Sequence, residues 1–218
     1  MKKSSYKKSL KIKKIQKRKS RIPTGISGFD NLIQGGFEEQ SVNLILGGSG
    51  SGKTIFAMQF LIEGIKRNET GLYITFEEKK DEFYKNMLEF GWDLEKAEKS
   101  GKFIFLEYSP EKVKAMLEEG GGAVESIVIK HNVKRIVIDS ITSFSLLFDD
   151  ELAKRQAALS LFDIIRKWSC TSLLTLQENP TPGENHDVSS LEFEVDSIIL
   201  LYFIRIKKKR KRFIEVLK

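Results

Sequence analysis

The chain has 218 residues, 40% of them hydrophobic and 31% charged, with a formal net charge of +7. This composition excludes a mostly disordered chain and is typical of one globular domain. No apolar run approaches the roughly 20 residues of a transmembrane helix, and the N-terminus lacks the apolar stretch of a signal peptide. We therefore expect a cytoplasmic protein that does not span a membrane.

The single cysteine, Cys170, excludes an intramolecular disulfide, and we expect a buried, unreactive thiol there.

The charge is divided unevenly along the chain. Of the 37 Lys and Arg residues, 11 lie in residues 1–21, which contain no acidic residue, so 26 remain against 30 acidic residues in 22–218. We expect residues 1–21 to form a basic tail that is disordered alone, because its charges repel one another. Residues 22–218 should form one domain. A second basic cluster, Arg205 with Lys207 to Arg212, lies near the C-terminus.

Hydrophobic periodicity predicts that strands and helices alternate along the domain. The predicted strands are 41–46, 72–76, 102–106, 135–138, 171–176, 197–204 and 212–217, and the predicted helices are 53–68, 81–90, 113–130 and 151–168. Three consecutive glycines, Gly120 to Gly122, leave the third helix open to a break. The alternation predicts an α/β fold with a mostly parallel central sheet flanked by helices and a C-terminal antiparallel hairpin.

A glycine-rich segment joins the first predicted strand of the domain to its first long helix. The pattern G-x-x-x-x-G-K-[ST] is filled by Gly47, Gly48, Ser49, Gly50, Ser51, Gly52, Lys53 and Thr54. Backbone N–H groups of such a loop and the positive end of the following helix surround phosphates. The lysine reaches the β and γ phosphates, and the Thr54 hydroxyl is a ligand of Mg²⁺. The segment therefore predicts a site for ATP with Mg²⁺.

Carboxylates follow two other predicted strands. Asp139 comes directly after 135–138, which we expect to be a neighbour of the loop strand, so that Asp139 can hold the water shell of Mg²⁺; a helix N-cap is the alternative role. Glu77 and Glu78 follow 72–76, which we expect to lie adjacent to the strand of the phosphate loop. There one carboxylate can act as base toward the attacking water while the other raises its pKa. A merely solvated acidic pair is the alternative.

These segments together resemble the KaiC family of the RecA superfamily, from Arg21 to Lys218. The resemblance is carried by the T-G-I-S-G-F-D string of Thr24 to Asp30, the loop from Gly47 to Thr54, Tyr73 to Glu78, and Ile136 to Ser140. It implies a RecA-like P-loop NTPase fold, Glu77 and Glu78 as catalytic residues, and Asp139 as the Walker B acid. It also implies a homo-oligomer, commonly a hexameric ring, with Mg-ATP held between subunits.

Two further roles follow from the resemblance. Gln177 and Glu178 would end the strand that senses the γ-phosphate, and Lys218 would reach the ATP of a neighbouring subunit. Family members typically continue from this lysine into Met-Arg-Gly, whereas this sequence stops at Lys218. We therefore expect a truncated C-terminal end, and weak turnover in the absence of that arginine, because a cation that stabilises the transferring phosphoryl group is missing.

The resulting hypothesis is a Mg²⁺-dependent ATPase that couples ATP occupancy to ring assembly or partner docking in regulation or signalling, with an unknown protein partner. One alternative is a nucleotide-gated binding module with little turnover. Another is a DNA- or RNA-associated RecA-like ATPase, because the tail and the cluster Lys207 to Arg212 can attract phosphates. The basic ends are also open to binding an anionic membrane or to simple solvation, since Tyr6 is the single aromatic residue in the tail.

Overall fold

The computed structural model describes residues 20–142, 148, 150–181 and 194–218. The expected disorder of the basic tail therefore concerns residues outside the described part of the chain, apart from its last two residues. The last of these, Arg21, lies in a short strand, β1 (Arg21–Ile22), which pairs with β2 (Phe37–Glu38). No helix in the described ranges is both long enough and apolar enough to cross a membrane.

A seven-stranded sheet with the order β5-β4-β6-β7-β3-β8-β9 forms the centre of the molecule. Its strands in chain order are β3 (Val42–Gly47), β4 (Thr70–Thr75), β5 (Phe103–Glu107), β6 (Val133–Asp139), β7 (Thr171–Gln177), β8 (Ser197–Ile206) and β9 (Lys209–Val216). Each neighbouring pair is parallel except β8 with β9, which is antiparallel. The predicted α/β fold with its C-terminal hairpin is thus confirmed.

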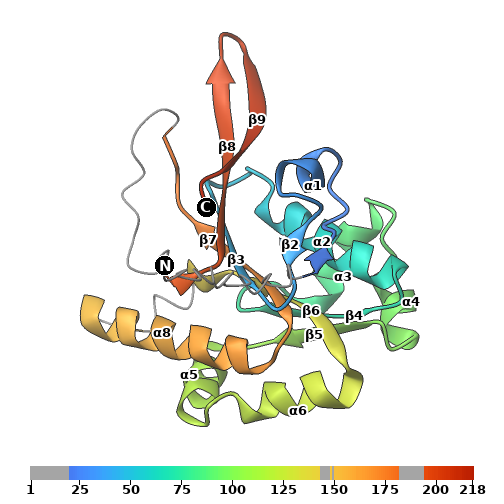
Figure 1. Cartoon of the computed structure of the whole chain (residues 1–218), viewed down its shortest axis with the longest axis vertical. Coiled ribbons are helices and arrows are strands. Elements are labelled where there is room, and N and C mark those ends of the chain that lie inside the picture. Colours follow the sequence, from blue (N-terminus) through green and yellow to red (C-terminus); the bar gives the residue numbers. More distant parts are fainter. Residues whose placement is uncertain (1–19, 143–147, 149, 182–193) are drawn as a thin grey trace, which may run out of the picture.

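Helices cover both faces of the sheet (Figure 1). They are α1 (Phe29–Leu32), α2 (Lys53–Lys66), α3 (Lys80–Leu88), α4 (Leu94–Lys99), α5 (Pro110–Glu118), α6 (Gly122–His131) and α8 (Glu151–Lys167). The break between α5 and α6 falls at the glycines, where Gly120 and Gly121 have φ angles of 69° and 80° that favour glycine. The helix α4 was not predicted from the sequence; it has six residues, and its N-cap, Asp93, accepts a hydrogen bond from the Lys96 N–H.

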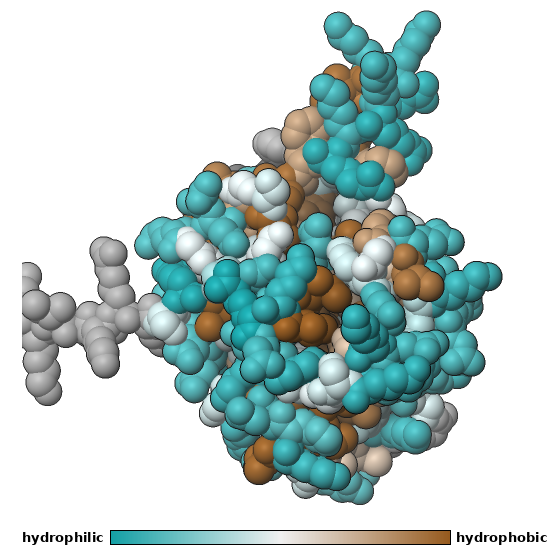
Figure 2. Space-filling model, turned by 90° about the vertical axis from the view of Figure 1, so that its right-hand side faces the viewer, coloured by the Kyte–Doolittle hydropathy of each residue, from teal (hydrophilic) through white to brown (hydrophobic). Residues whose placement is uncertain are grey.

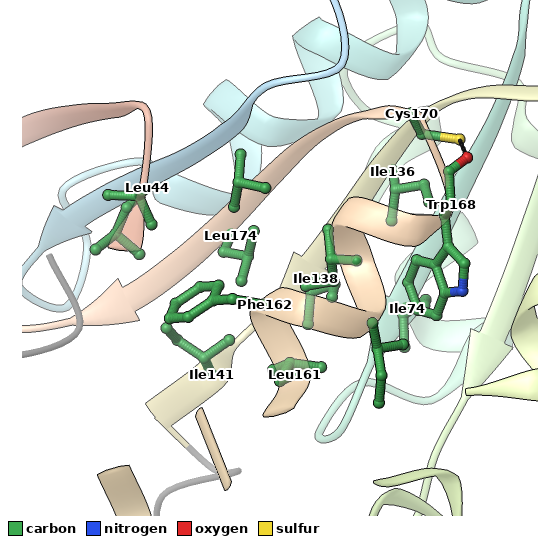
Figure 3. Packing of buried hydrophobic residues seen from close by; sticks show 14 of the residues in the cluster. Leu44, Ile74, Ile136, Ile138, Ile141, Leu161, Phe162, Trp168, Cys170 and Leu174 are labelled. Atoms are coloured by element: carbon green, nitrogen blue, oxygen red, sulfur yellow. Dashed lines mark hydrogen bonds between the residues drawn. The ribbon is translucent and has the colours of Figure 1, made fainter. Parts of the chain in front are cut away.

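Two apolar clusters lie on opposite faces of the sheet, because successive strand residues point in opposite directions. In β4, Leu72 and Ile74 pack in the cluster under α5, α6 and α8, whereas Tyr73 packs in the cluster under α2 and α3. Figure 3 shows Trp168 and Cys170 within the first cluster. The predicted burial of Cys170 is confirmed, and burial raises the pKa of its thiol to about 11, which keeps it protonated and unreactive.

A buried arginine ties the N-terminal segment to the sheet. The Arg135 side chain is fully buried, and its Nε donates to Glu69 Oε2 at 2.6 Å. Its Nη1 donates to the carbonyl oxygens of Pro23 and Phe60 at 2.7 and 2.9 Å. These bonds join the segment before α1 to α2 and β6.

We expect Arg135→Ala to lower the free energy of unfolding by about 3 kcal/mol, because it leaves a cavity and two carbonyl groups without their donor. Arg135→Met keeps most of the volume and should recover part of the loss. Urea unfolding followed by circular dichroism measures both. Equal stability of Arg135→Ala and the parent chain would contradict the structural role of this arginine.

Candidate functional site

The glycine-rich loop lies where β3 ends and α2 begins. Gly52 precedes Lys53, the first residue of α2, with a φ angle of 104° that a residue with a side chain rarely adopts. Gly48 lies close to another loop, so that a Cβ atom there would be 1.9 Å from the Asn179 Oδ1. The loop therefore carries no side chain at its glycine positions, and the N-terminus of a 14-residue helix points at it, as anion binding requires.

The Lys53 ammonium group folds over this loop. Its Nζ donates to the carbonyl oxygens of Gly47 at 2.7 Å and Gly48 at 3.2 Å. Partial burial lowers the pKa of Lys53, while the negative charges of Asp139 and Glu77 oppose that change. Two neutral carbonyl groups are weak partners for a partly buried cation, so a phosphate oxygen would be a better acceptor.

Asp139 is the centre of a cluster of hydroxyl groups. Its Oδ2 accepts hydrogen bonds from Thr54 Oγ1 at 2.7 Å and from the Tyr73 hydroxyl at 2.9 Å. Its Oδ1 accepts from Thr175 Oγ1 at 2.5 Å. The expectation that the strand of Asp139 is a direct neighbour of the loop strand is wrong, because β7 lies between β6 and β3. The contact forms because Thr54 comes from α2, which packs across β6 and β7.

The glutamate pair follows β4, and the prediction that this strand is adjacent to the loop strand is wrong. Both β6 and β7 lie between β4 and β3. After β3 the chain passes over two strand positions to form β4 and β5, and β6 and β7 later fill the two positions between β4 and β3. The pair still faces the site, since Glu77 Oε1 accepts a hydrogen bond from Ser140 Oγ at 3.3 Å. The N–H groups of Glu77 and Glu78 both donate to Thr75 Oγ1, at 3.2 and 3.0 Å, which fixes the turn.

Burial raises the pKa of Glu78, and the charges of Asp139, Glu82 and Glu77 raise it further. The increase has the direction expected for one member of a carboxylate pair whose neighbours share its charge. A carboxylate of higher pKa is a stronger base. Its ionised form is lost as the pH falls through this raised pKa, so the site offers a base with an acid limit to its activity.

Thr54 and Asp139 fit a magnesium ion by their chemistry. Both offer oxygen atoms, the ligands that Mg²⁺ prefers, and Mg²⁺ usually takes only one or two ligands from protein and the rest from phosphates and water. The 2.7 Å bond between the two side chains holds both oxygens at one point beside the loop. Within the described residues no cluster of three or more His, Cys, Asp and Glu side chains has the geometry to hold a metal alone.

The other predicted site residues lie at opposite edges of the sheet. The Gln177 N–H donates to Thr142 Oγ1 at 2.7 Å, and the Glu178 N–H donates to the Gly47 carbonyl at 3.3 Å. Both residues are therefore beside the phosphate loop. Lys218 lies at the amino ends of the parallel strands, where its Nζ donates to the Val195 carbonyl at 2.7 Å. It is remote from the loop of its own chain, and its role toward a neighbouring subunit stays a prediction.

Three side chains at the site were not predicted from the sequence. Tyr73 and Thr175 are buried strand residues whose hydroxyl groups reach Asp139, and only the strand order brings them together. Arg212 donates to the Gly50 carbonyl from Nε at 3.2 Å and from Nη2 at 2.9 Å. Its guanidinium carbon lies 4.5 Å from the centre of the Phe203 ring. The contacts of Arg212 depend on the register of β8 with β9, so the sequence of the basic cluster alone does not single out this arginine.

Comparison with known proteins points to one family. A family model described as "ATPase: KaiC" matches residues 22–218. The circadian clock protein KaiC3 of Synechocystis sp. is 36% identical over 205 residues, which cover 91% of this chain and 41% of that protein. The circadian clock oscillator protein KaiC of Prochlorococcus marinus subsp. pastoris is 34% identical, with 94% of this chain and 42% of that protein covered.

A solved structure shows the same architecture. The crystal structure of a KaiC-like protein from the hyperthermophilic archaeon Pyrococcus horikoshii superposes with a TM-score of 0.79 at 35% sequence identity. The match covers 91% of this chain and 88% of that one. The mostly parallel sheet and its flanking helices are therefore shared with a protein of similar length. By contrast, the chain spans about two fifths of the length of the two cyanobacterial relatives.

Proposed function

This chain belongs to the KaiC family of ATPases, and we propose that it is a Mg²⁺-dependent ATPase that couples ATP occupancy to ring assembly or to docking of a protein partner. The observation that carries the proposal is the hydrogen bond between Thr54 and Asp139. It brings the first residues of the phosphate-loop helix into contact with a buried carboxylate from a different strand. A phosphate-binding loop and a metal-holding acid within hydrogen-bond distance form the minimal site for a nucleoside triphosphate with Mg²⁺.

ATP binding begins with the exchange of partners at Lys53. The ammonium group leaves the carbonyl oxygens of Gly47 and Gly48 for the β and γ phosphates, while the loop N–H groups and the start of α2 surround the same oxygens. Exchange is favourable because a charged acceptor replaces two neutral ones. Thr54 and Asp139 would hold Mg²⁺, which neutralises charge on the phosphates when it is bound.

Hydrolysis needs a water molecule in line with the γ-phosphate. Glu78, whose pKa is raised by burial, accepts the proton of that water, while Glu77 is held by Ser140. Gln177 and Glu178, next to the Gly47 carbonyl, would respond to the presence of the γ-phosphate. Positioning and electrostatic stabilisation supply most of the rate in phosphoryl transfer.

An apolar groove beside the loop fits the nucleobase. It has a volume of about 350 Å³ and is lined by Ile26, Gly52, Ile55, Phe90 and Phe213 among others. Phe90 and Phe213 are 54% and 42% exposed, so both rings are accessible for stacking on a planar base. Arg212, which closes the outer side of the loop through Gly50, lines the same groove and adds a positive charge near the phosphates.

Ring assembly would place ATP between two copies of the chain, with Lys218 of one copy near the nucleotide of the next. The position of Lys218 at the edge opposite its own loop is compatible with action on a neighbour and not with action on its own site. Regulation or signalling is the role that we assign to this coupling, because occupancy of a shared site controls how strongly subunits associate.

ATP hydrolysis by the purified chain, measured at several protein concentrations with and without Mg²⁺ and beside a sizing experiment, tests the proposal. Mg²⁺-dependent turnover that rises per subunit as larger assemblies form is the expected result. Tight ATP binding without turnover at any concentration would instead identify a nucleotide-gated binding module. Turnover that requires added DNA or RNA would identify a nucleic-acid-associated ATPase, and absence of ATP binding would refute the proposal altogether.

Tyr73 should position Asp139 for the metal. Tyr73→Phe keeps the ring, which stacks on Phe83 at 4.6 Å and on Phe105 at 5.6 Å, and removes only the hydroxyl donor. We expect the Mg²⁺ concentration for half-maximal ATP binding to rise about 3- to 10-fold, because one donor to a charged carboxylate is lost. Titration of a fluorescent ATP analogue with Mg²⁺ measures this. Tyr84→Phe, which loses a hydroxyl bonded to Glu98, is the matched control and should leave the Mg²⁺ requirement unchanged.

A further inference from the structure

The hairpin of β8 and β9 projects beyond the helices that cover the sheet (Figure 1). Figure 2 shows hydrophilic side chains at its far end and hydrophobic ones nearer the body. The far end comprises residues 205–212, which we call the hairpin tip. Seven of these eight residues are Lys or Arg, and every residue of the tip is exposed. The tip is thus a concentrated positive charge held away from a domain whose remaining residues are on balance acidic.

The register of the two strands places these charges on both faces of the ribbon. Phe203 lies opposite Arg212, and Arg205 lies opposite Arg210. Opposed residues share a face, and the guanidinium carbons of Arg210 and Arg212 both lie over the Phe203 ring, at 5.1 and 4.5 Å. Lys209 and Lys211 project from the opposite face, paired with isoleucines of β8. The turn adds two more lysines at 207 and 208.

This arrangement is unfavourable for the hairpin alone. Arg205 and Arg210 are directly opposed like charges, which destabilise an antiparallel pair. Among the described salt bridges, none involves a residue of the hairpin tip. Arg212 donates instead to a neutral acceptor, the Gly50 carbonyl. Locally unfavourable interactions are expected in segments that bind a partner. An anionic partner would offset the repulsion between the positive charges of the hairpin tip.

We propose that the hairpin tip binds the phosphate backbone of duplex nucleic acid. The major groove of B-form DNA admits a two-stranded β-ribbon, and the phosphates then lie on both sides of that ribbon. Cations on both faces and at the turn match this geometry. An anionic membrane would be met by apolar residues at the turn and cations on one side. Here the turn is Lys207 and Lys208, the adjacent Ile206 is paired with Lys209, and Phe213 and Ile214 lie nearer the body.

The test is fluorescence anisotropy of a labelled 30-base-pair DNA duplex titrated with the full chain at several salt concentrations, without nucleotide. The hairpin variant carries Lys208→Gln, Lys209→Gln, Arg210→Gln and Lys211→Gln, which leaves Arg212 at the nucleotide loop. A body control removes the same charge from exposed positions elsewhere: Lys85→Gln, Lys96→Gln, Lys130→Gln and Lys134→Gln. A tail control carries Lys2→Gln, Lys3→Gln, Lys7→Gln and Lys8→Gln.

We expect the hairpin variant to bind the duplex at least about tenfold more weakly near 0.1 M salt, with the slope of log affinity against log salt reduced by about 3 to 4. Both controls should remain within about threefold of the parent. Melting temperature and ATP binding check that the hairpin variant is folded. If it is not folded, the single variant Lys208→Glu at the turn replaces it, and we expect a proportionally smaller loss of affinity for the duplex.

Four outcomes overturn the proposal. One is the absence of duplex binding by the parent chain, and another is an equal loss in all three variants, which would reflect net charge alone. A third is binding to phosphatidylserine vesicles with no binding to the duplex. The last is a hairpin variant that changes the size of the assembly while duplex binding is unaffected, which would show that the tip contacts a second copy of the chain. None of these results depends on ATP hydrolysis, so the proposed ATPase stands or falls separately.

Discussion

Replacement of Glu77 and Glu78 together by glutamine is expected to reduce ATP hydrolysis by at least about 10²-fold, because general base catalysis contributes about 10² to 10⁴ in rate. ATP affinity should stay within about threefold of the parent, since neither side chain belongs to the phosphate loop. The variant keeps the shape of both side chains and the turn built on Thr75. Steady-state phosphate release and equilibrium binding of a fluorescent ATP analogue separate the two effects.

The matched control is Glu118→Gln with Glu119→Gln, an adjacent acidic pair at the end of α5 that is exposed. It removes the same charge at a distance from the site and should hydrolyse ATP at the parent rate. Hydrolysis by the Glu77 and Glu78 variant at the parent rate would show that the base is another group, and that the pair is only a solvated acidic surface.

The two single variants assign the base. Because the pKa of Glu78 is raised above its ordinary value of 4.5, the ionised, proton-accepting form is lost as the pH falls through that raised pKa. Turnover by the parent chain should therefore rise with pH across an acid limb that starts above pH 4.5. Glu78→Gln should abolish the limb together with most of the rate. If Glu77→Gln does so instead, the two roles are exchanged.

The alternation of strands and helices could be predicted from sequence because each element carries its own periodicity. The strand that ends at Gly47 is buried throughout, the helix that begins at Lys53 has 14 residues and one buried face, and the loop between them has an explicit motif. The short helix α4 was missed because six residues with four charges, Leu94 to Lys99, show no hydrophobic repeat.

The order of the strands could not be predicted in the same way. Glu77, Glu78 and Asp139 were each located at a strand end, but their strands were assumed to be neighbours of the loop strand, and β7 and β6 occupy the intervening positions. The order of the strands depends on how the crossover connections pack on the sheet, and this packing is not a local property of any one segment. The hydroxyl donors Tyr73 and Thr175 depend on that order, so no pattern in the sequence pointed to them.

Lys53→Ala is the change with the largest expected effect on ATP binding. Removal of one partner of a desolvated charge pair costs about 2 to 5 kcal/mol, which corresponds to a loss of about 30- to several thousand-fold in affinity. The stability of the ATP-free chain should change little, because within the described part of the chain the ammonium group donates to two neutral carbonyl groups, those of Gly47 and Gly48, and its partial burial is itself unfavourable.

Lys66→Ala is the control for Lys53→Ala because Lys66 is an exposed residue in the last turn of the same helix. Isothermal titration with ATP and Mg²⁺ should give the parent affinity for this control and an affinity at least about 30-fold lower for Lys53→Ala. A melting temperature that falls only in the Lys53 variant would indicate lost packing rather than a lost phosphate contact. Tight ATP binding by Lys53→Ala would mean that the loop N–H groups and the helix N-terminus alone hold the phosphates, and the exchange of partners at this lysine would then be wrong.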